Sequence, residues 1–273
     1  MTFSSSGRSI FITGGGSGIG RATALHFAAK GWFVGVSDIN EAGMAETLSK
    51  IAGEAKWSGR LDVRDRAAWD ESLAGFAQAA GGRIDAMVNN AGIGTGGALA
   101  DLGKDEIDAC LDINLRGVLY GAQAVYPYLK ASGPGSALIN IASAAGLTGG
   151  SGMSVYSATK FGVRGIAESL DAEWAVDGIT VASICPSFID TPLLDGTGNR
   201  NTNENIRTRV TAAGLEITPV EEVAQAVWNA VHGHEVHYLV GKTARQLAFA
   251  KRWMPGKLRK QQRAAGRQGL LGK

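Results

Sequence analysis

The sequence predicts an α/β protein built on a doubly wound parallel sheet of seven strands with helices on both faces. Three observations predict it. Short apolar strands alternate with helical segments along the chain, which is the pattern of βαβ units. A glycine-rich turn joins the first strand to the first helix. Polar residues follow several strands, at the edge of the sheet where ligands collect in such folds.

Length and composition agree with this class. The 273 residues, 45% of them hydrophobic, are enough to bury one large core. We find no run of 18 apolar residues and no hydrophobic leader at residues 1–8. Two cysteines, Cys110 and Cys185, fit a reducing compartment and are expected to be buried. We expect a cytoplasmic protein with a single catalytic domain over residues 1–240 and a basic extension over 241–273.

The first strand is short and apolar and precedes the glycine turn, and the second closes on Asp38. The third ends at Asp62, and an apolar run makes the sixth a central strand. A later helix is expected to start at Pro219 with Thr218 as its N-cap. The seven strands are expected at residues 9–13, 33–38, 55–62, 86–89, 137–141, 180–186 and 236–240.

The turn Thr13-Gly14-Gly15-Gly16-Ser17-Gly18-Ile19-Gly20 has the composition of a phosphate-binding loop. Glycines allow positive φ, let a pyrophosphate approach the backbone, and let helix and strand pack closely. The free N–H groups and the positive dipole end of the next helix then face the phosphates. An ordinary glycine-rich loop is the alternative interpretation.

Asp38 stands about 20 residues after the turn, where a ribose-binding acid is expected in a dinucleotide site. A carboxylate there accepts hydrogen bonds from the adenosine ribose and repels a 2′-phosphate, so NAD is preferred over NADP. The alternative is a turn or N-cap residue, a role that Asn40 fills equally well.

Tyr156 and Lys160 are four residues apart, so on a helix their side chains share one face. A lysine charge beside a phenol favours the phenolate and lowers a pKa that is about 10 in a free phenol. Tyr156 is therefore a candidate general acid/base. This spacing also occurs by chance on exposed helices, so the interpretation depends on the rest of the chain.

Taken together, these segments resemble the short-chain dehydrogenase/reductase family over about residues 9–241. The resemblance depends on five motifs in the family's order: the glycine turn, Asn89-Asn90-Ala91-Gly92, Asn114, Ser143, and Tyr156 with Lys160. It implies a Rossmann fold, a nicotinamide cofactor, a small-molecule alcohol or ketone as substrate, and a homotetramer or dimer. A catalytically silent dinucleotide sensor or scaffold on the same fold is the alternative.

The resemblance also implies roles for single residues. Tyr156 exchanges the substrate proton, Ser143 polarises the reacting oxygen, Lys160 also holds the nicotinamide ribose, and Asn114 holds a water that links the lysine to solvent. The implied cofactor-binding residues are Gly14, Ser17, Gly18, Ile19, Gly20, Asp38, Asp62, Val63, Asn90, Ala91, Gly92, Tyr156, Lys160, Pro186, Ile189 and Thr191.

Two of these positions carry alternatives. Asp62 and Val63 are implied beside the adenine, but Asp62 and Asp65 are equally suited to start a capped helix. Ser187 stands where the family usually has glycine, so a positive φ there would cost energy.

Residues 191–218 are polar and glycine-rich, and we expect them to form a mobile substrate lid.

Residues 241–273 contain ten Lys or Arg and no Asp or Glu, whereas residues 1–240, with 17 basic and 25 acidic residues, carry −8. Bulky residues such as Phe249 and Trp253 alternate with these charges and suggest a hydrophobic substrate or an anionic membrane surface. We favour packing against the chain's own domain or a partner subunit, with disorder after about Arg263. Nucleic acid is not expected as a partner, and the close histidines His232, His234 and His237 lack the acids or cysteines of a metal site.

Overall fold

The computed structural model describes residues 7–196 and 198–267. Its centre is a seven-stranded sheet in the order β3-β2-β1-β4-β5-β6-β7, and each neighbouring pair is parallel. The predicted fold class is therefore confirmed. The strands are β1 (Ser9–Thr13), β2 (Phe33–Asp38), β3 (Lys56–Arg60), β4 (Ala86–Asn89), β5 (Ala137–Ile141), β6 (Thr180–Pro186) and β7 (His237–Val240).

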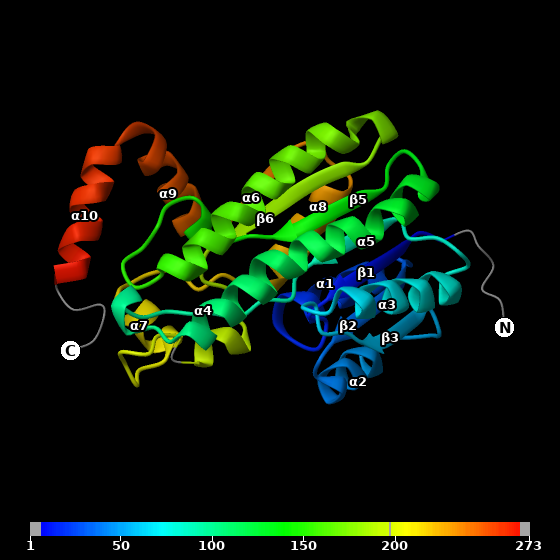
Figure 1. Ribbon diagram of the computed structural model, residues 1–273, viewed down its shortest axis with the longest axis horizontal. Helices are drawn as coiled ribbons and strands as arrows, with labels where there is room; N and C mark the ends of the chain where they lie inside the picture. The colour runs from blue at the N-terminus through cyan, green and yellow to red at the C-terminus, as the bar shows by residue number, and fades with distance from the viewer. Residues whose placement is uncertain (1–6, 197, 268–273) are drawn as a thin grey trace.

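Helices cover both faces of the sheet (Figure 1). On one face, Phe27 and Val227 pack against strand residues such as Ile10, while on the other Trp69 and Leu129 belong to a second buried cluster. The helices are α1 (Gly18–Ala29), α2 (Glu41–Ser49), α3 (Arg66–Ala79), α4 (Lys104–Leu111), α5 (Gly117–Ser132), α6 (Ser154–Trp174), α7 (Ile206–Ala212), α8 (Val220–Val231), α9 (Lys242–Trp253) and α10 (Pro255–Arg267).

A π-helical turn over Asp112–Arg116 joins α4 to α5. Asn114 lies in this wider turn. Such turns add one residue to a helix and are frequent at functional sites. Asn114 is fully buried there.

The start of α8 differs from the prediction. Pro219, not Thr218, is the N-cap, and it makes no side-chain cap bond. Thr218 instead forms an isolated bridge with Ile189, and their two segments exchange backbone bonds on either side of it. It is buried because it holds the segment that follows β6.

The segment expected to be a lid contains regular structure. A short helical turn covers Pro192–Asp195, and α7 begins after Asn205, whose side chain accepts from the N–H of Thr208 at 2.8 Å. Arg207 in α7 pairs with both Asp190 and Asp195 at 2.8 Å. These contacts tie α7 back to the end of β6.

The basic extension forms two helices. α9 ends at Trp253 and α10 begins at Pro255, where the missing N–H of proline costs nothing because the first helical N–H groups have no partner in the helix. The disorder expected after about Arg263 is wrong as far as Arg267, because α10 continues to that residue. Residues 268–273 lie outside the described part of the chain. No helix among the described residues is long and apolar enough to cross a bilayer.

Candidate active site

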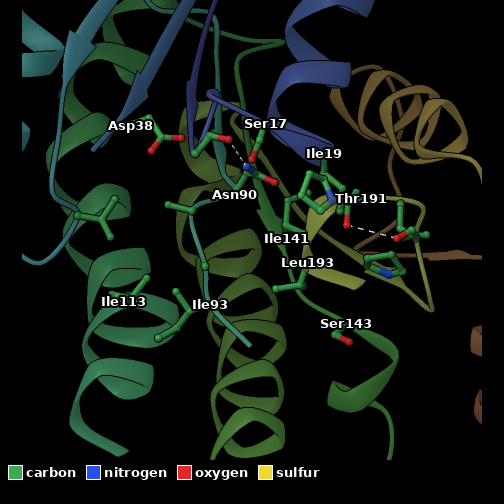
Figure 2. Close-up of a pocket in the computed structure, with 18 of the residues that line it drawn as sticks. Ser17, Ile19, Asp38, Asn90, Ile93, Ile113, Ile141, Ser143, Thr191 and Leu193 are labelled. Carbon is green, nitrogen blue, oxygen red and sulfur yellow. Dashed lines mark hydrogen bonds between the residues drawn. The ribbon is translucent and has the colours of Figure 1, made fainter. Parts of the chain in front are cut away.

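A cavity of about 520 Å³ lies at the carboxyl ends of the strands. Its lining includes Ser143, Tyr156 and Lys160, and every predicted cofactor residue except Gly20. Figure 2 shows Asp38 and Ser143 on opposite sides of the cavity, with Ser17 and Asn90 between them. The structure thus brings together residues from seven separate segments. Sequence reasoning missed the further lining residues Ile39, Leu61, Arg64, Ile93, Ile113, Ile141, Ala142, Ser187, Pro192, Leu193 and Leu194.

The glycine turn is shaped by close backbone contacts. Gly14 has φ +64, and a Cβ there would lie 2.8 Å from Nδ2 of Asn90. Gly20 does not line the cavity, and its contact with a cofactor stays a prediction. A Cβ on Gly20 would lie 2.2 Å from the Gly14 carbonyl oxygen, which makes its role close packing beneath the turn.

Asparagine amides tie the turn to the neighbouring strands. Nδ2 of Asn90 donates to the carbonyl oxygens of Thr13 at 2.8 Å and Gly14 at 3.1 Å. Nδ2 of Asn89 donates to Oδ1 of Asn140 at 2.9 Å and so connects β4 to β5. These amide bonds fix the turn and the ends of the strands beside it.

Asp38 is held at the end of β2 by backbone donors. Its carboxylate accepts from the N–H of Gly16 at 2.9 Å and from the N–H of Asn40 at 3.0 Å. Asn40 itself caps α2 by accepting from the N–H of Gly43. The cap role therefore belongs to Asn40, and the Asp38 carboxylate faces the cavity as a fixed negative charge.

Asp62 forms an ion pair with Arg64 at 2.6 Å, and the Arg64 hydrogen bond lowers the pKa of the Asp62 carboxyl. The cap of α3 is Asp65, whose side chain accepts from the N–H of Ala67 at 2.9 Å and of Ala68 at 3.2 Å. Asp62 is therefore not the cap, and both members of the ion pair line the cavity. The feature of the sequence that could have indicated this ion pair is the position of Arg64 two residues after Asp62.

Tyr156 and Lys160 lie on one face of α6, with the Lys160 Nζ 5.6 Å from the centroid of the tyrosine ring. Burial raises the pKa of Tyr156, and a hydrogen bond with Ser143 acts in the opposite direction. The expectation that Lys160 brings this pKa down is wrong for this structure, because burial dominates. Nζ of Lys160 donates to the carbonyl oxygen of Ile141 at 2.9 Å.

The Lys160 ammonium is itself buried, with the residue 5% exposed, and burial lowers the pKa of Lys160 to about 8. In the unfolded chain the pKa returns to 10.5, its ordinary value. Between these two values the unfolded chain binds more protons than the folded one, so stability rises with pH there. Below about pH 8 both states are protonated and the cost of burying the charge is present in full.

We therefore expect the free energy of unfolding of the wild type, relative to Lys160→Met, to increase from about pH 8 to about 10.5. Urea unfolding of both proteins across that range measures the difference, and groups common to both cancel. Lys56→Met is the matched control, since Nζ of Lys56 also donates to two carbonyl oxygens but the residue is only partly buried. If the difference in the free energy of unfolding between the wild type and Lys160→Met did not change with pH, the expectation would be contradicted.

Asn114 does not line the cavity but holds one of its walls. Its Nδ2 donates to the carbonyl oxygen of Ile93 at 2.8 Å, and its Oδ1 accepts from the N–H of Ile93 at 2.8 Å. Gly92 keeps this region narrow, since a Cβ there would lie 3.2 Å from Oδ1 of Asn114 and 3.7 Å from Nζ of Lys160. Asn114 thus fixes the segment after β4 beside the lysine.

Replacing Asn114 with alanine leaves the N–H and carbonyl of Ile93 without these partners. We expect Asn114→Ala to lower the free energy of unfolding by about 2–4 kcal/mol, because each unsatisfied group costs about 1–3 kcal/mol. Urea unfolding measures the loss. Asn229→Ala on the exposed side of α8 is the control and is expected to cost under about 0.5 kcal/mol. Equal losses in the two variants would contradict the role of Asn114.

Ser187 fits its position without backbone strain. Among the described residues, only glycines have positive φ. The positive φ of this region falls on Gly241, at +87, and a Cβ there would lie 2.2 Å from Oγ of Ser187. The strain considered for Ser187 is therefore absent.

The sequence profile of the short chain dehydrogenase family matches residues 8–205. The chain belongs to the short-chain dehydrogenase/reductase family. Its seven-stranded parallel sheet is the family's Rossmann fold.

Two curated relatives show the range of this short-chain dehydrogenase/reductase family. The chain is 37% identical over 191 residues to the probable oxidoreductase EphD of Mycobacterium tuberculosis, an alignment that covers 69% of this chain and 32% of EphD. It thus spans about a third of the length of that relative. It is 36% identical over 195 residues to 3-oxoacyl-(acyl-carrier-protein) reductase FabG of Thermotoga maritima, covering 69% of this chain and 77% of FabG.

Two solved short-chain dehydrogenase/reductase structures share the fold. One from Burkholderia phymatum in complex with NAD has a TM-score of 0.82 at 24% identity and covers 95% of this chain and 97% of that one. Actinorhodin polyketide ketoreductase with NADPH has a TM-score of 0.80 at 28% identity and covers 88% of this chain and 98% of that one. Family structures thus hold either NAD or NADPH.

Proposed function

We propose that this chain transfers a hydride between a nicotinamide cofactor, with NAD preferred, and a secondary alcohol or ketone of apolar character. The observation that carries the proposal is the meeting of Tyr156, Ser143 and Lys160 in the cavity that the glycine turn also lines. The activity, substrate and partners of the whole protein are part of this proposal.

The residues present fit a bound dinucleotide. The positive φ of Gly14 and the close contacts of Gly14 with Asn90 leave a cradle that a side chain would fill. Ser17, the N-cap of α1, makes no side-chain cap bond, so the helix end is open to an anion. Asp38 would hold the adenosine ribose, and Lys160 the ribose nearest Tyr156, where the cofactor would supply the hydride chemistry.

Tyr156 and Ser143 would act on the substrate oxygen. In oxidation, Tyr156 in its deprotonated form would accept the hydroxyl proton, and the carbinol carbon would become a carbonyl as its hydride passes to the nicotinamide cofactor. In reduction, Tyr156 donates its proton to the carbonyl oxygen. The raised pKa keeps the phenol protonated at neutral pH, which is the form that donates. Ser143 hydrogen-bonds the same oxygen and orients it.

The preference for an apolar substrate is supported by side chains on the Ser143 side of the cavity. Leu193 and Leu194 follow β6, and Ile93 follows β4. Leu193 is 49% exposed, so an apolar molecule in the cavity would cover it. The names of the 3-oxoacyl-(acyl-carrier-protein) reductase and of the polyketide ketoreductase support the same substrate class.

A homo-oligomer is also part of the proposal. Leu119 on α5 and Phe161 on α6 are 47% and 40% exposed, and α5 and α6 lie next to one another on one face of the sheet (Figure 1). Apolar residues of this size on adjacent helices are typical of surfaces between subunits.

The alternative function, a dinucleotide sensor without turnover, predicts a different result in one assay. The purified protein is supplied with NAD or NADP and a panel of steroids, long-chain alcohols, sugars and small secondary alcohols, and with the matching ketones and reduced cofactors. We expect turnover with NAD and an apolar secondary alcohol or ketone. Tight cofactor binding with no turnover across the panel would favour the sensor.

A further inference from the structure

Helices α9 and α10 form a hairpin at one end of the molecule, beyond the loop that leads into α6 (Figure 1). The inner side of α9 is attached to the domain through Ala244, which is fully buried, and through Leu247. Leu247 packs against a buried cluster that includes Val118, Val163 and Cys185. α10 buries Leu258, and Nε2 of its Gln262 donates to Oγ1 of Thr148 at 3.0 Å and to the carbonyl oxygen of Gly149 at 2.6 Å. The hairpin therefore has a fixed orientation on the domain.

The outer side of the hairpin carries an apolar tip, which consists of Phe249, Trp253 and Met254. These side chains are 58%, 64% and 39% exposed. Phe249 and Met254 also line a groove of about 580 Å³ between the two helices, together with Arg245, Ala250, Lys257 and Leu258. Three bulky apolar residues this exposed within six positions indicate a surface that is covered by another molecule.

The cations around the apolar tip lack acidic partners. No salt bridge among the described residues involves any Lys or Arg between residues 242 and 263. The guanidinium of Arg252 lies over the Trp253 ring at 5.3 Å. Elsewhere in the described chain most arginines pair with carboxylates, as Arg21 does with Glu46. The eight basic side chains between residues 242 and 263 are therefore available to an external anion.

We propose that the α9–α10 hairpin docks on the surface of an anionic lipid bilayer. The apolar tip enters the boundary between headgroups and acyl chains, and Lys251, Arg252, Lys257 and Lys260 face the anionic headgroups. Tryptophan, phenylalanine and basic residues on a helix pair are the combination that binds such interfaces. Long lysine and arginine stems reach headgroups while their apolar neighbours lie deeper.

A bilayer fits this surface better than nucleic acid does. Phosphate backbones would satisfy the cations, but they offer no apolar medium for the exposed side chains of the apolar tip. In an anionic bilayer, a layer of negatively charged headgroups covers the apolar acyl chains. The binding free energy then has a contribution from burial of the apolar tip and another from attraction between the basic residues and the headgroups.

The test is co-sedimentation of the full chain with vesicles of phosphatidylcholine alone or mixed with phosphatidylglycerol. We expect binding to the mixed vesicles and weak binding to the neutral ones, with a loss of affinity as salt is added. The double variants Phe249→Ser/Trp253→Ser and Lys257→Glu/Lys260→Glu should each lower the partition coefficient at least about tenfold, since each basic residue near the surface contributes about 1 kcal/mol.

Matched variants at other exposed positions serve as controls. Val176→Ser, at a residue 86% exposed beyond α6, and Lys30→Glu/Arg60→Glu should leave binding within about twofold. Thermal unfolding shows that each variant is folded. Failure of the wild type to bind mixed vesicles would overturn the proposal. So would unchanged binding in both tip and charge variants, tight binding to duplex DNA without vesicle binding, or a change of oligomeric state alone in the tip variant.

Discussion

Tyr156→Phe is expected to reduce turnover at least about 100-fold, because general acid/base catalysis typically contributes about 10²–10⁴ in rate. The substitution removes one oxygen and keeps the ring, which lies at the start of α6 beside Lys160. Initial rates with NAD and the best substrate from the panel measure the loss. Binding of reduced cofactor, followed by fluorescence, should stay within about threefold, because the phenol hydroxyl supplies little of the dinucleotide contact.

The matched control is Tyr126→Phe. The hydroxyl of Tyr126, in α5, donates to the carboxylate of Asp177 at 2.7 Å. The variant therefore loses a surface hydrogen bond and no catalytic group. We expect its turnover to be unchanged and its free energy of unfolding to fall by about 1 kcal/mol. If Tyr156→Phe turned over like Tyr126→Phe, the proposed chemistry would be wrong even if the protein bound NAD.

Asp38→Asn is expected to reduce the preference for NAD at least about tenfold. The two carboxylate oxygens each accept from one backbone N–H, of Gly16 and of Asn40. Asparagine removes the charge and keeps one of these two acceptor oxygens. Like charges 4 Å apart repel by about 4 kcal/mol at an effective dielectric of 20, and a third of that already corresponds to about tenfold. The ratio of kcat/KM with NAD to kcat/KM with NADP is the measured quantity.

Glu41→Gln removes a carboxylate three residues after Asp38, at the first residue of α2, from an exposed side chain that pairs with Arg60 at 3.8 Å. We expect this control to leave the cofactor ratio within about twofold. An Asp38→Asn ratio equal to that of the control would show that Asp38 does not select the cofactor. Turnover with NAD would persist in that case, so the proposed reaction class and the proposed cofactor preference are tested separately.

Much of the site was predictable because it depends on chain order and on the geometry of parallel sheets. Asp38, Asn90 and Ser143 each follow a strand, and the carboxyl ends of parallel strands meet at one edge. The helical spacing of Tyr156 and Lys160 then placed both in the same cavity.

The parts that sequence reasoning missed depend on packing between distant segments. The pairing of Arg64 with Asp62 is a choice among side-chain rotamers, and spacing does not determine it. The raised pKa of Tyr156 follows from its burial, which a pattern of residue types does not measure. The contact of Gln262 with Gly149 joins residues 113 positions apart, so no local signal predicts it.

The π-helical turn at Asp112–Arg116 makes this stretch intolerant of changes in length. A helix rotates by about 100° for each residue, so a one-residue deletion there would swing α4 by more than a quarter of a revolution relative to α5. Cys110, now fully buried with its Sγ 3.5 Å from Nδ2 of Asn114, would leave the interior. Natural variation in chain length is therefore expected in exposed loops and not in this turn, whose single extra residue keeps two helices in phase.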